Sequence, residues 1–334
     1  MNSQNEEQKQ QQKAKELPPP PPPLSEVDQE RARLQEELKR RLIVKDTAPW
    51  ADDISSCRYM AGLDVSYEKD DSPPGSATRC AAALVILDTE DWSLVYQDVL
   101  FGEARAQYAA GFLAFREIDL LLALVERLKA AAAAAQSQRE SSKSSPNSSP
   151  PPPPPPPTPD VWLIDGNGVM HPRGLGLASH FGVLVDQPTV GVSKNPYFFD
   201  DSHFEGGEGG RGGRVDRVAF KQQLARRLLK RGDCLPITNG ADGSSTVVGV
   251  ALKVQDAVAG PVYVSVGHRV SLETAIAVVL RCSRRYKNPE PLRQADMISR
   301  QALRKRKEKE EKEEKEELMR MNKNVTDLKA LRLS

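Results

Sequence analysis

Three acidic residues interrupt segments that are otherwise apolar. Asp64 lies within GLDVS, Glu117 lies within FLAFREIDL, and Asp165 ends VWLID. A lone buried carboxylate is costly, so it normally takes up a proton or gains a compensating charge. A divalent cation with oxygen ligands would keep all three ionised. The pattern indicates a Mg²⁺ site, although each acid taken alone is more simply interpreted as a satisfied strand-end or cap carboxylate.

A glycine-rich block follows Asp165 and reads DGNGVMHPRGLGLASHFGVLVDQPTVGVSKN over residues 165–195. The glycines on either side of Asn167 would let the backbone approach a ligand closely. The Walker pattern GxxxxGK[ST] does not occur, so a P-loop is excluded. Lys194, just after an expected strand, suits a phosphate contact, although an isolated lysine is more often a solvated surface residue.

The histidines and cysteines do not form a recognisable metal site. His171 and His180 could contribute to a zinc site, but no cysteine pair or third histidine lies near them. His268, in VSVGHRVSLE, lies between an expected strand and a helix, where it could serve either an active site or the helix start. The four cysteines include no CxxC and indicate reduced thiols of an intracellular protein.

Hydrophobic periodicity predicts an α/β fold in which a mixed sheet is flanked by helices. Three sequential strands come first, and later strands alternate with helices, so the sheet should have an antiparallel half and a parallel half. Two strands and a helix would then bring the three acids to one end of the sheet. The expected strands are 59–67, 79–87, 92–101, 161–164, 189–192, 246–254 and 262–266, and the expected helices are 28–44, 111–135, within 174–184, 218–230 and 271–285.

Low-complexity segments divide the chain. Residues 1–27 are Gln- and Pro-rich and predict a disordered tail, with an SH3 or WW ligand as the alternative. Residues 28–304 form one expected domain, interrupted by a Ser/Pro-rich insertion at 136–159 and a Gly-rich loop at 205–214. Residues 305–334 predict a charged helical tail with Glu–Lys pairs at i,i+4.

The composition of the chain says little about its function. The 334 residues carry a net charge of +1, so bulk charge predicts no partner. No apolar run reaches the roughly 18 residues of a membrane span, and the N-terminus lacks the apolar stretch of a signal peptide. We expect no membrane partner and a location in the cytoplasm, the nucleus or both, including the nucleolus. The protein partners of the proline tracts and the tail stay unknown.

Four segments together resemble the endonuclease V family of inosine-directed nucleases: GLDVSY, YAAGFLAFRE, the DGNG block and VGHRVSLE. The resemblance extends from about residue 59 to residue 300. It implies an RNase H-like fold with a mixed five-stranded sheet. It also implies that Asp64, Glu117 and Asp165 bind Mg²⁺, for which Mn²⁺ could substitute. Lys194 matches the family's functional lysine, and His268 matches its active-site histidine.

The resemblance further implies a pocket for a flipped hypoxanthine base, beside which His171 and Arg173 are candidate phosphate contacts. Tyr108 matches the aromatic residue of a wedge that holds the strand open. The chain departs from the family pattern at Gln107, where a proline is common, and at Asn195, where a second lysine is common. The pocket positions are Gly111, Leu113, Gly166 and Gly176.

The implied reaction is hydrolysis of the second phosphodiester bond on the 3′ side of inosine, which leaves 3′-hydroxyl and 5′-phosphate ends. The nucleic-acid partner would be inosine-containing single-stranded RNA, or single-stranded or damaged DNA that contains deoxyinosine. Such a reaction serves nucleic-acid repair or the turnover of inosine-containing RNA. Two alternatives remain: a non-cleaving inosine-RNA binding module, and another RNase H-like nuclease such as a junction resolvase or transposase.

Overall fold

The computed structural model describes residues 24–68, 77–104, 111–143, 152–195, 217–239 and 246–331. Within this part of the chain, eight strands form one sheet in the order β3-β2-β1-β4-β5-β8-β7-β6. The strands are β1 (Tyr59–Tyr67), β2 (Thr78–Asp88), β3 (Leu94–Ala104), β4 (Val161–Asp165), β5 (Thr189–Ser193), β6 (Cys234–Asn239), β7 (Thr246–Leu252) and β8 (Val262–His268).

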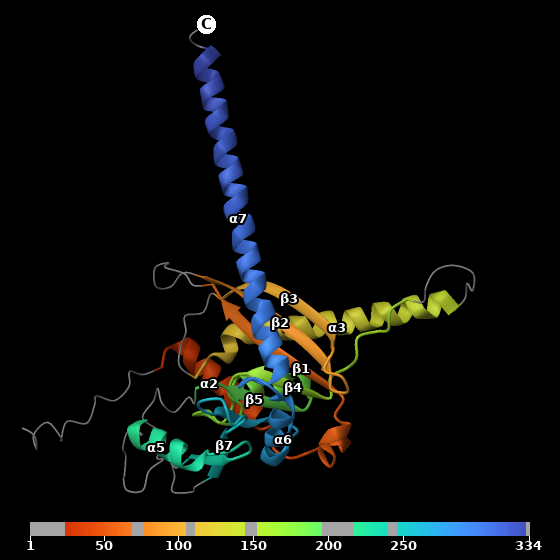
Figure 1. Cartoon of the computed structure of the whole chain (residues 1–334), viewed down its shortest axis with the longest axis vertical. Helices are drawn as coiled ribbons and strands as arrows, with labels where there is room; N and C mark the ends of the chain where they lie inside the picture. Colours follow the sequence, from red (N-terminus) through yellow and green to blue (C-terminus); the bar gives the residue numbers. More distant parts are fainter. Residues whose placement is uncertain are drawn as a thin grey trace, which may run out of the picture.

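Helices cover both faces of the sheet (Figure 1). Leu121 and Leu124 of α3 pack with Phe181 of α4 on one face. Val278 and Val279 of α6 pack on the other face, where α7 also crosses β1 and β2. None of the described helices is both long and apolar enough to cross a membrane. The helices are α2 (Glu26–Lys39), α3 (Ala114–Lys143), α4 (Leu177–Val185), α5 (Arg217–Arg227), α6 (Leu272–Cys282) and α7 (Glu290–Leu331), with short 3₁₀ turns η1 (Pro49–Ala51) and η2 (Ile54–Ser56).

The predicted mixed sheet is confirmed, but it has more than five strands. β3, β2 and β1 are antiparallel, whereas β1, β4 and β5 run parallel. The sheet continues past β5 because β8 pairs antiparallel with it and carries β7 and β6 beyond. β6 was not expected from the sequence because CLPITN is short and has a proline at its centre, which disfavours a strand.

Two helices differ from the sequence prediction. α3 continues to Lys143 and therefore occupies the first part of the insertion expected as a loop at 136–159. Residues 136–143 extend the alanine run with helix-forming Gln, Arg, Glu and Lys, which explains the continuation. α7 begins at Glu290, so the charged tail continues a helix that already packs on the sheet. Figure 1 shows the far end of α7 projecting away from the domain.

Parallel pairing places the ends of three strands at one edge. Leu63 of β1 lies beside Ile164 of β4, and Asp165 lies beside Val192 of β5. Parallel strands present their carboxyl ends at the same edge of a sheet. Asp64, Asp165 and the residues after β5 therefore meet there.

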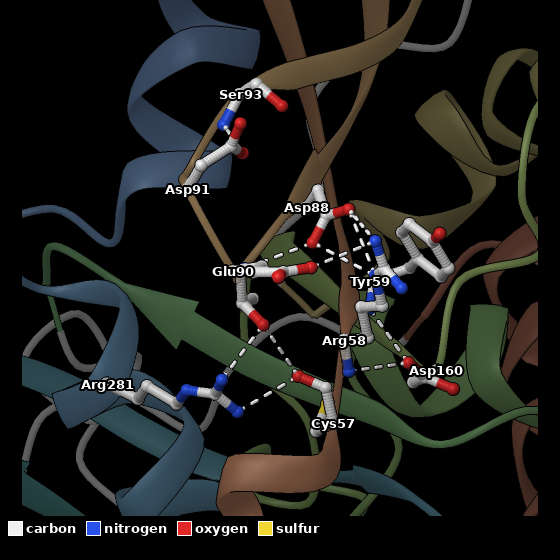
Figure 2. Close-up of polar contacts among 10 residues, drawn as sticks. Cys57, Arg58, Tyr59, Asp88, Glu90, Asp91, Ser93, Asp160 and Arg281 are labelled. Atoms are coloured by element: carbon white, nitrogen blue, oxygen red, sulfur yellow. Dashed lines mark hydrogen bonds and ion pairs between the residues drawn. The ribbon is translucent and has the colours of Figure 1, made fainter.

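The opposite end of β1 is fixed by a polar network (Figure 2). The Arg58 guanidinium lies 2.8 Å from Oδ2 of Asp88. Oδ2 of Asp160 accepts hydrogen bonds from the backbone N–H groups of Arg58 and Tyr59. Arg281 donates to the carbonyl oxygen of Cys57. These contacts tie the start of β1 to the start of β4 and to α6, so the network anchors the sheet at the end away from Asp64.

Candidate active site

The ends of β1 and β4 bring Asp64 and Asp165 into hydrogen-bonding contact. Asp64 is only 6% exposed. Burial raises the pKa of Asp64 to about 7, and the carboxylates of Asp165 and Asp296 add to the rise. Nearby like charges disfavour the ionised form of a buried carboxyl. The pair is therefore electrostatically unfavourable in the ionised form and ready to accept a cation.

Glu117 enters the same edge from the first turn of α3, on the face of the sheet opposite to α7. It is buried, and its Oε1 accepts a hydrogen bond from the Tyr67 hydroxyl at 2.6 Å. Burial raises the pKa of Glu117 to about 8, opposed by the Tyr67 hydrogen bond and reinforced by the charges of Asp64 and Asp165. The three predicted acids thus form one electrostatic cluster.

Lys194 follows β5 and supplies a positive charge to this cluster. Its Nζ atom lies 3.0 Å from Oδ2 of Asp165 and 3.7 Å from Oδ1 of Asp296. Burial alone would lower the pKa of Lys194, but the carboxylates of Asp165, Asp296 and Asp64 outweigh that effect and raise it. The side chain stays protonated and joins β4 to α7.

Two residues of α7, Asp296 and Ser299, belong to this cluster, and neither was expected from the sequence. Asp296 approaches Lys194, and its charge contributes to the raised pKa of Asp64. The Ser299 hydroxyl donates to Oδ2 of Asp64 at 3.1 Å. The signal that could have found them is the run PEPLRQADMISR, where Leu292, Ala295 and Ser299 recur at helical spacing and all are buried.

A cavity of about 360 Å³ opens directly beside the acids. All four residues predicted for a base pocket line it, together with Asp165 and Lys194. Gly111 has φ +79°, a conformation that other residues adopt only with strain. A Cβ atom at Gly176 would lie 2.3 Å from the carbonyl oxygen of Asn167, so only glycine fits there. The lining includes Gly111, Leu113, Gly166, Gly176, Asn195 and Gln35.

The carbonyl oxygen of Gly111 is held by three side chains at the rim of this cavity. Nε2 of Gln35 donates to it at 3.1 Å, and Nε2 of His171 lies at 3.1 Å. The Arg173 guanidinium also donates to it and stacks over the Phe112 ring at 4.1 Å. His171 and Arg173 were predicted as phosphate contacts, and the structure shows them fixing the start of α3.

His268 does not lie with the acids, so its predicted place in the active site is wrong. β8 runs antiparallel to β5, and His268 pairs with Thr189 at the start of β5, whereas Lys194 follows its end. The His268 ring is buried, with Nδ1 accepting from the Ile43 N–H and Nε2 3.2 Å from Oδ1 of Asp186. Burial lowers its pKa. His268 thus connects the segment after α2 to the end of α4.

Several predictions lie outside the described residues. Tyr108, the expected wedge residue, and its neighbour Gln107 are among them. The Gly-rich loop at 205–214, most of the N-terminal tail and the centre of the 136–159 insertion are also outside.

Comparison with known proteins identifies the family. The family model for Endonuclease V matches residues 36–297, which is most of the chain. The chain belongs to the endonuclease V family. It is 37% identical to human endonuclease V over 275 residues, which are 82% of each chain. It is 33% identical to endonuclease V of Streptomyces avermitilis over 277 residues, 83% of this chain and 93% of the bacterial one.

Solved endonuclease V structures share the fold, which is RNase H-like. The crystal structure of the catalytic domain of human endonuclease V superimposes with a TM-score of 0.66 at 35% identity, covering 85% of this chain and 98% of that one. The Ciona intestinalis enzyme, solved with a 24mer DNA containing an inosine followed by a ribo-adenosine, gives a TM-score of 0.61 at 29% identity. That match covers 84% of this chain and 98% of the Ciona chain.

The endonuclease V site has the chemistry of a divalent-cation site. Asp64 and Asp165 offer neighbouring carboxylate oxygens, and burial makes the ionised form of Asp64 costly without a compensating charge. Within the described residues, no group of three Asp, Glu, His or Cys side chains is arranged so that it could hold a metal ion. Asp64 points towards α7 whereas Tyr67 holds Glu117 on the α3 side. The donor set fits a cation centred on Asp64 and Asp165.

Proposed function

We propose that this protein is a Mg²⁺-dependent endonuclease that cleaves inosine-containing nucleic acid. Cleavage falls at the second phosphodiester bond on the 3′ side of inosine and leaves 3′-hydroxyl and 5′-phosphate ends. One observation carries the proposal: the same cavity of about 360 Å³ is lined by the charged Asp165 and Lys194 and by the glycines Gly111, Gly166 and Gly176. A base held in that cavity places the sugar–phosphate backbone of its strand beside the acids.

The acids and Lys194 divide the chemistry between them. Asp64 and Asp165 would hold the cation, with Asp296 and Glu117 as further carboxylates at its border. When bound, Mg²⁺ or Mn²⁺ polarises a phosphate oxygen and lowers the pKa of water. Lys194 neutralises the charge that develops on the phosphate during hydrolysis. Ser299 orients the Asp64 carboxylate through its hydrogen bond.

The cavity supports recognition of a flipped purine. Glycines at Gly166 and Gly176 let main-chain groups approach the edge of a base, where a side chain would block them. Inosine lacks the exocyclic amino group of guanine, so a close main-chain wall can distinguish the two. The Ciona relative, solved with inosine-containing DNA, supports a substrate of this class.

Single-stranded substrates avoid most of the cost of unpairing, which favours inosine-containing RNA or single-stranded DNA over a perfect duplex. Gln107 replaces a proline that is common in the family wedge. A less rigid wedge opens a duplex less well, which also favours single-stranded substrates. The role would be nucleic-acid repair or the turnover of inosine-containing RNA, in the cytoplasm or nucleus.

The test is a cleavage assay with matched RNA and DNA oligonucleotides that carry either inosine or adenosine at one position. We expect cutting of the inosine strands with Mg²⁺, no cutting with EDTA, and a single product whose 3′ end maps the cleaved bond. Asp64→Asn is the matched control, because it keeps the size of the side chain.

Other outcomes would assign another function. Equal cutting of both oligonucleotides would identify a different RNase H-like nuclease. Selective binding without cutting would identify an inosine-RNA binding module.

A further inference from the structure

A basic surface lies on α5 and the turn after it. Residues 217–231 read RVAFKQQLARRLLKR and include no acidic residue. Lys221, Arg226, Arg227 and Lys230 are all exposed. Leu228 and Phe220 are buried and pack α5 against β6 and β7. Phe220 and Leu228 therefore face the sheet, whereas the cations face solvent together with the exposed Val218 and Leu229.

These cations differ from the cations of the charged tail. On α7, Arg304 pairs with Glu308, Arg306 with Glu310 and Lys309 with Glu313, each at i,i+4. Among the described residues, no ion pair involves a cation of α5 (Lys221, Arg226, Arg227), Lys230, Lys253 or Lys287. Intramolecular partners neutralise the tail, whereas the α5 surface leaves its positive charge for another molecule.

The sheet register places this surface at the active edge. β8 pairs with β5 through Tyr263 and Ser193, and with β7 through Val262 and Leu252. Lys253 comes directly after β7, and Lys194 comes directly after β5. The strands β5 and β7 are two strand spacings apart, which is about 10 Å. Asp165 on β4 is three strand spacings from Lys253, about 14 Å, which is less than two Debye lengths at physiological salt.

Lys287 and a shallow groove fill the interval between the active site and α5. Lys287 is close enough to Lys194 for the two charges to repel, and it lies beside Gly260 in the turn before β8. Lys221 and Lys253 line a cavity of about 290 Å³ with Gly260 and Leu224. The cations therefore continue from Lys194 through Lys287 and Lys253 to Lys221.

Two acids lie near this surface, and both are bound to backbone N–H groups. Asp233 accepts from the N–H groups of Leu229 and Lys230. Asp256 accepts from the N–H of Arg231. Both carboxylates thus cap chain turns, and the charge of Lys230 also acts on Asp233. The Lys253 ammonium donates to the carbonyl oxygen of Val258 at 2.7 Å and forms no ion pair with any described residue.

We propose that Lys287, Lys253, Lys221 and the exposed face of α5 bind the sugar–phosphate backbone of the nucleic acid that flanks the cleavage site. This inference rests on the proposed function and specifies where the substrate strand binds outside the cleavage site. A polyanion is the partner because this surface carries a row of cations that form no ion pair among the described residues, with no acidic residue in 217–231. Backbone contacts of this kind position the strand and add affinity without reading its sequence.

The experiment compares the full chain with the double variant Lys221→Gln, Lys253→Gln. The substrates are a short inosine oligonucleotide that spans only the scissile region and longer ones extended on the 5′ or the 3′ side, each as RNA and as DNA. We expect KM for one of the extended series to rise about tenfold, with the short substrate unchanged. Two lost phosphate contacts on a single strand should also reduce the slope of log K against log salt by about 1.4.

The matched control is Lys305→Gln, Lys307→Gln, which removes the same charge from exposed positions on α7 and should leave all substrates unchanged. Lys221→Glu alone is a second test variant, because its exposed side chain lies on the solvent side of a helix. If the wild-type chain cuts inosine substrates and the variants alter short and extended ones equally, the α5 path is wrong. If the wild-type chain shows no preference for inosine, the proposed function itself fails.

Discussion

The hydroxyl of Ser299 donates to Oδ2 of Asp64 at 3.1 Å, although the two residues are 235 positions apart in the chain. The Ser66 hydroxyl lies 2.7 Å from that of Ser299 and 3.3 Å from the same carboxylate oxygen. Ser299 is fully buried. α7 therefore does more than cover the sheet: it fixes the orientation of the carboxylate at the centre of the proposed cation site.

Replacing Ser299 by alanine should reduce cleavage more than it reduces stability. A hydrogen bond to a charged group contributes about 1.5–3 kcal/mol, and about 1.4 kcal/mol is a tenfold change in rate. We expect kcat to fall at least tenfold at saturating Mg²⁺, measured by single-turnover cleavage. Ser66→Ala is the control, and its longer contact predicts a smaller loss. Equal losses in the two variants would argue against a specific role for α7.

Asp64→Asn should abolish cleavage and stabilise the chain in the absence of a cation. The amide keeps an oxygen acceptor for Ser299 and removes one charge from a buried cluster that includes Asp165. We expect the free energy of unfolding in EDTA to rise by about 1–2 kcal/mol, measured by urea denaturation.

Adding Mg²⁺ should stabilise the wild-type chain and leave Asp64→Asn nearly unchanged, since a ligand stabilises only the state that binds it. The same Mg²⁺ stabilisation in both proteins would place the cation elsewhere.

Gln35→Glu should weaken substrate binding more than it slows the chemical step. Gln35 is 1% exposed, and its Nε2 donates to the carbonyl oxygens of Gly111 and Leu175, each at 3.1 Å. Glutamate has the same shape but cannot donate as a carboxylate, so the pocket rim loses two hydrogen bonds. We expect KM for an inosine oligonucleotide to rise about tenfold with a smaller change in kcat. A fall in kcat alone would show that Gln35 acts on the acids and not on the pocket.

The sequence predicted the two strands and the helix that carry the acids because each acid breaks a strong apolar pattern. It missed Asp296 and Ser299, since the helix that begins at Glu290 has a proline on each side of that residue and leads into a charged run, which hides its short apolar repeat. The error at His268 has a different cause. The block VSVGHRVSLE shows that His268 is near a strand end, but only the antiparallel pairing of β8 with β5 shows which end of the sheet that strand end occupies.

Gly62→Ala should damage both stability and activity through α7. A Cβ atom at Gly62 would lie 2.3 Å from the carbonyl carbon of Pro291, which is backbone and cannot rotate away. α7 would have to move, and its Asp296 and Ser299 with it. We expect a loss of about 1–3 kcal/mol in the free energy of unfolding and a larger relative loss of cleavage. Gly102→Ala is the control, because its Cβ would meet only the flexible side chain of Leu120.

His180 should make the free energy of unfolding depend on pH. The dependence should fall between the ordinary histidine pKa of about 6.5 and the lowered pKa of His180 in the folded chain. The ring is 2% exposed on α4, and burial lowers its pKa to about 4. The folded state therefore keeps His180 neutral while the unfolded chain takes up a proton below about pH 6.5. The stability that this residue contributes is complete above that pH and is lost as the pH falls towards 4.

Comparison of the wild-type chain with His180→Asn isolates this effect, because Asp64 and Glu117, whose raised pKa values act in the opposite direction, are present in both proteins. From pH 7.5 to pH 5 the wild-type chain should lose about 2 kcal/mol more than the variant, measured by urea denaturation. The asparagine will lower stability at every pH by removing the ring that packs edge-on against Phe115 at 5.2 Å. That loss is constant, so only the difference in slope reports the proton. Parallel pH profiles would mean that His180 has the same pKa in the folded and the unfolded chain, against its burial.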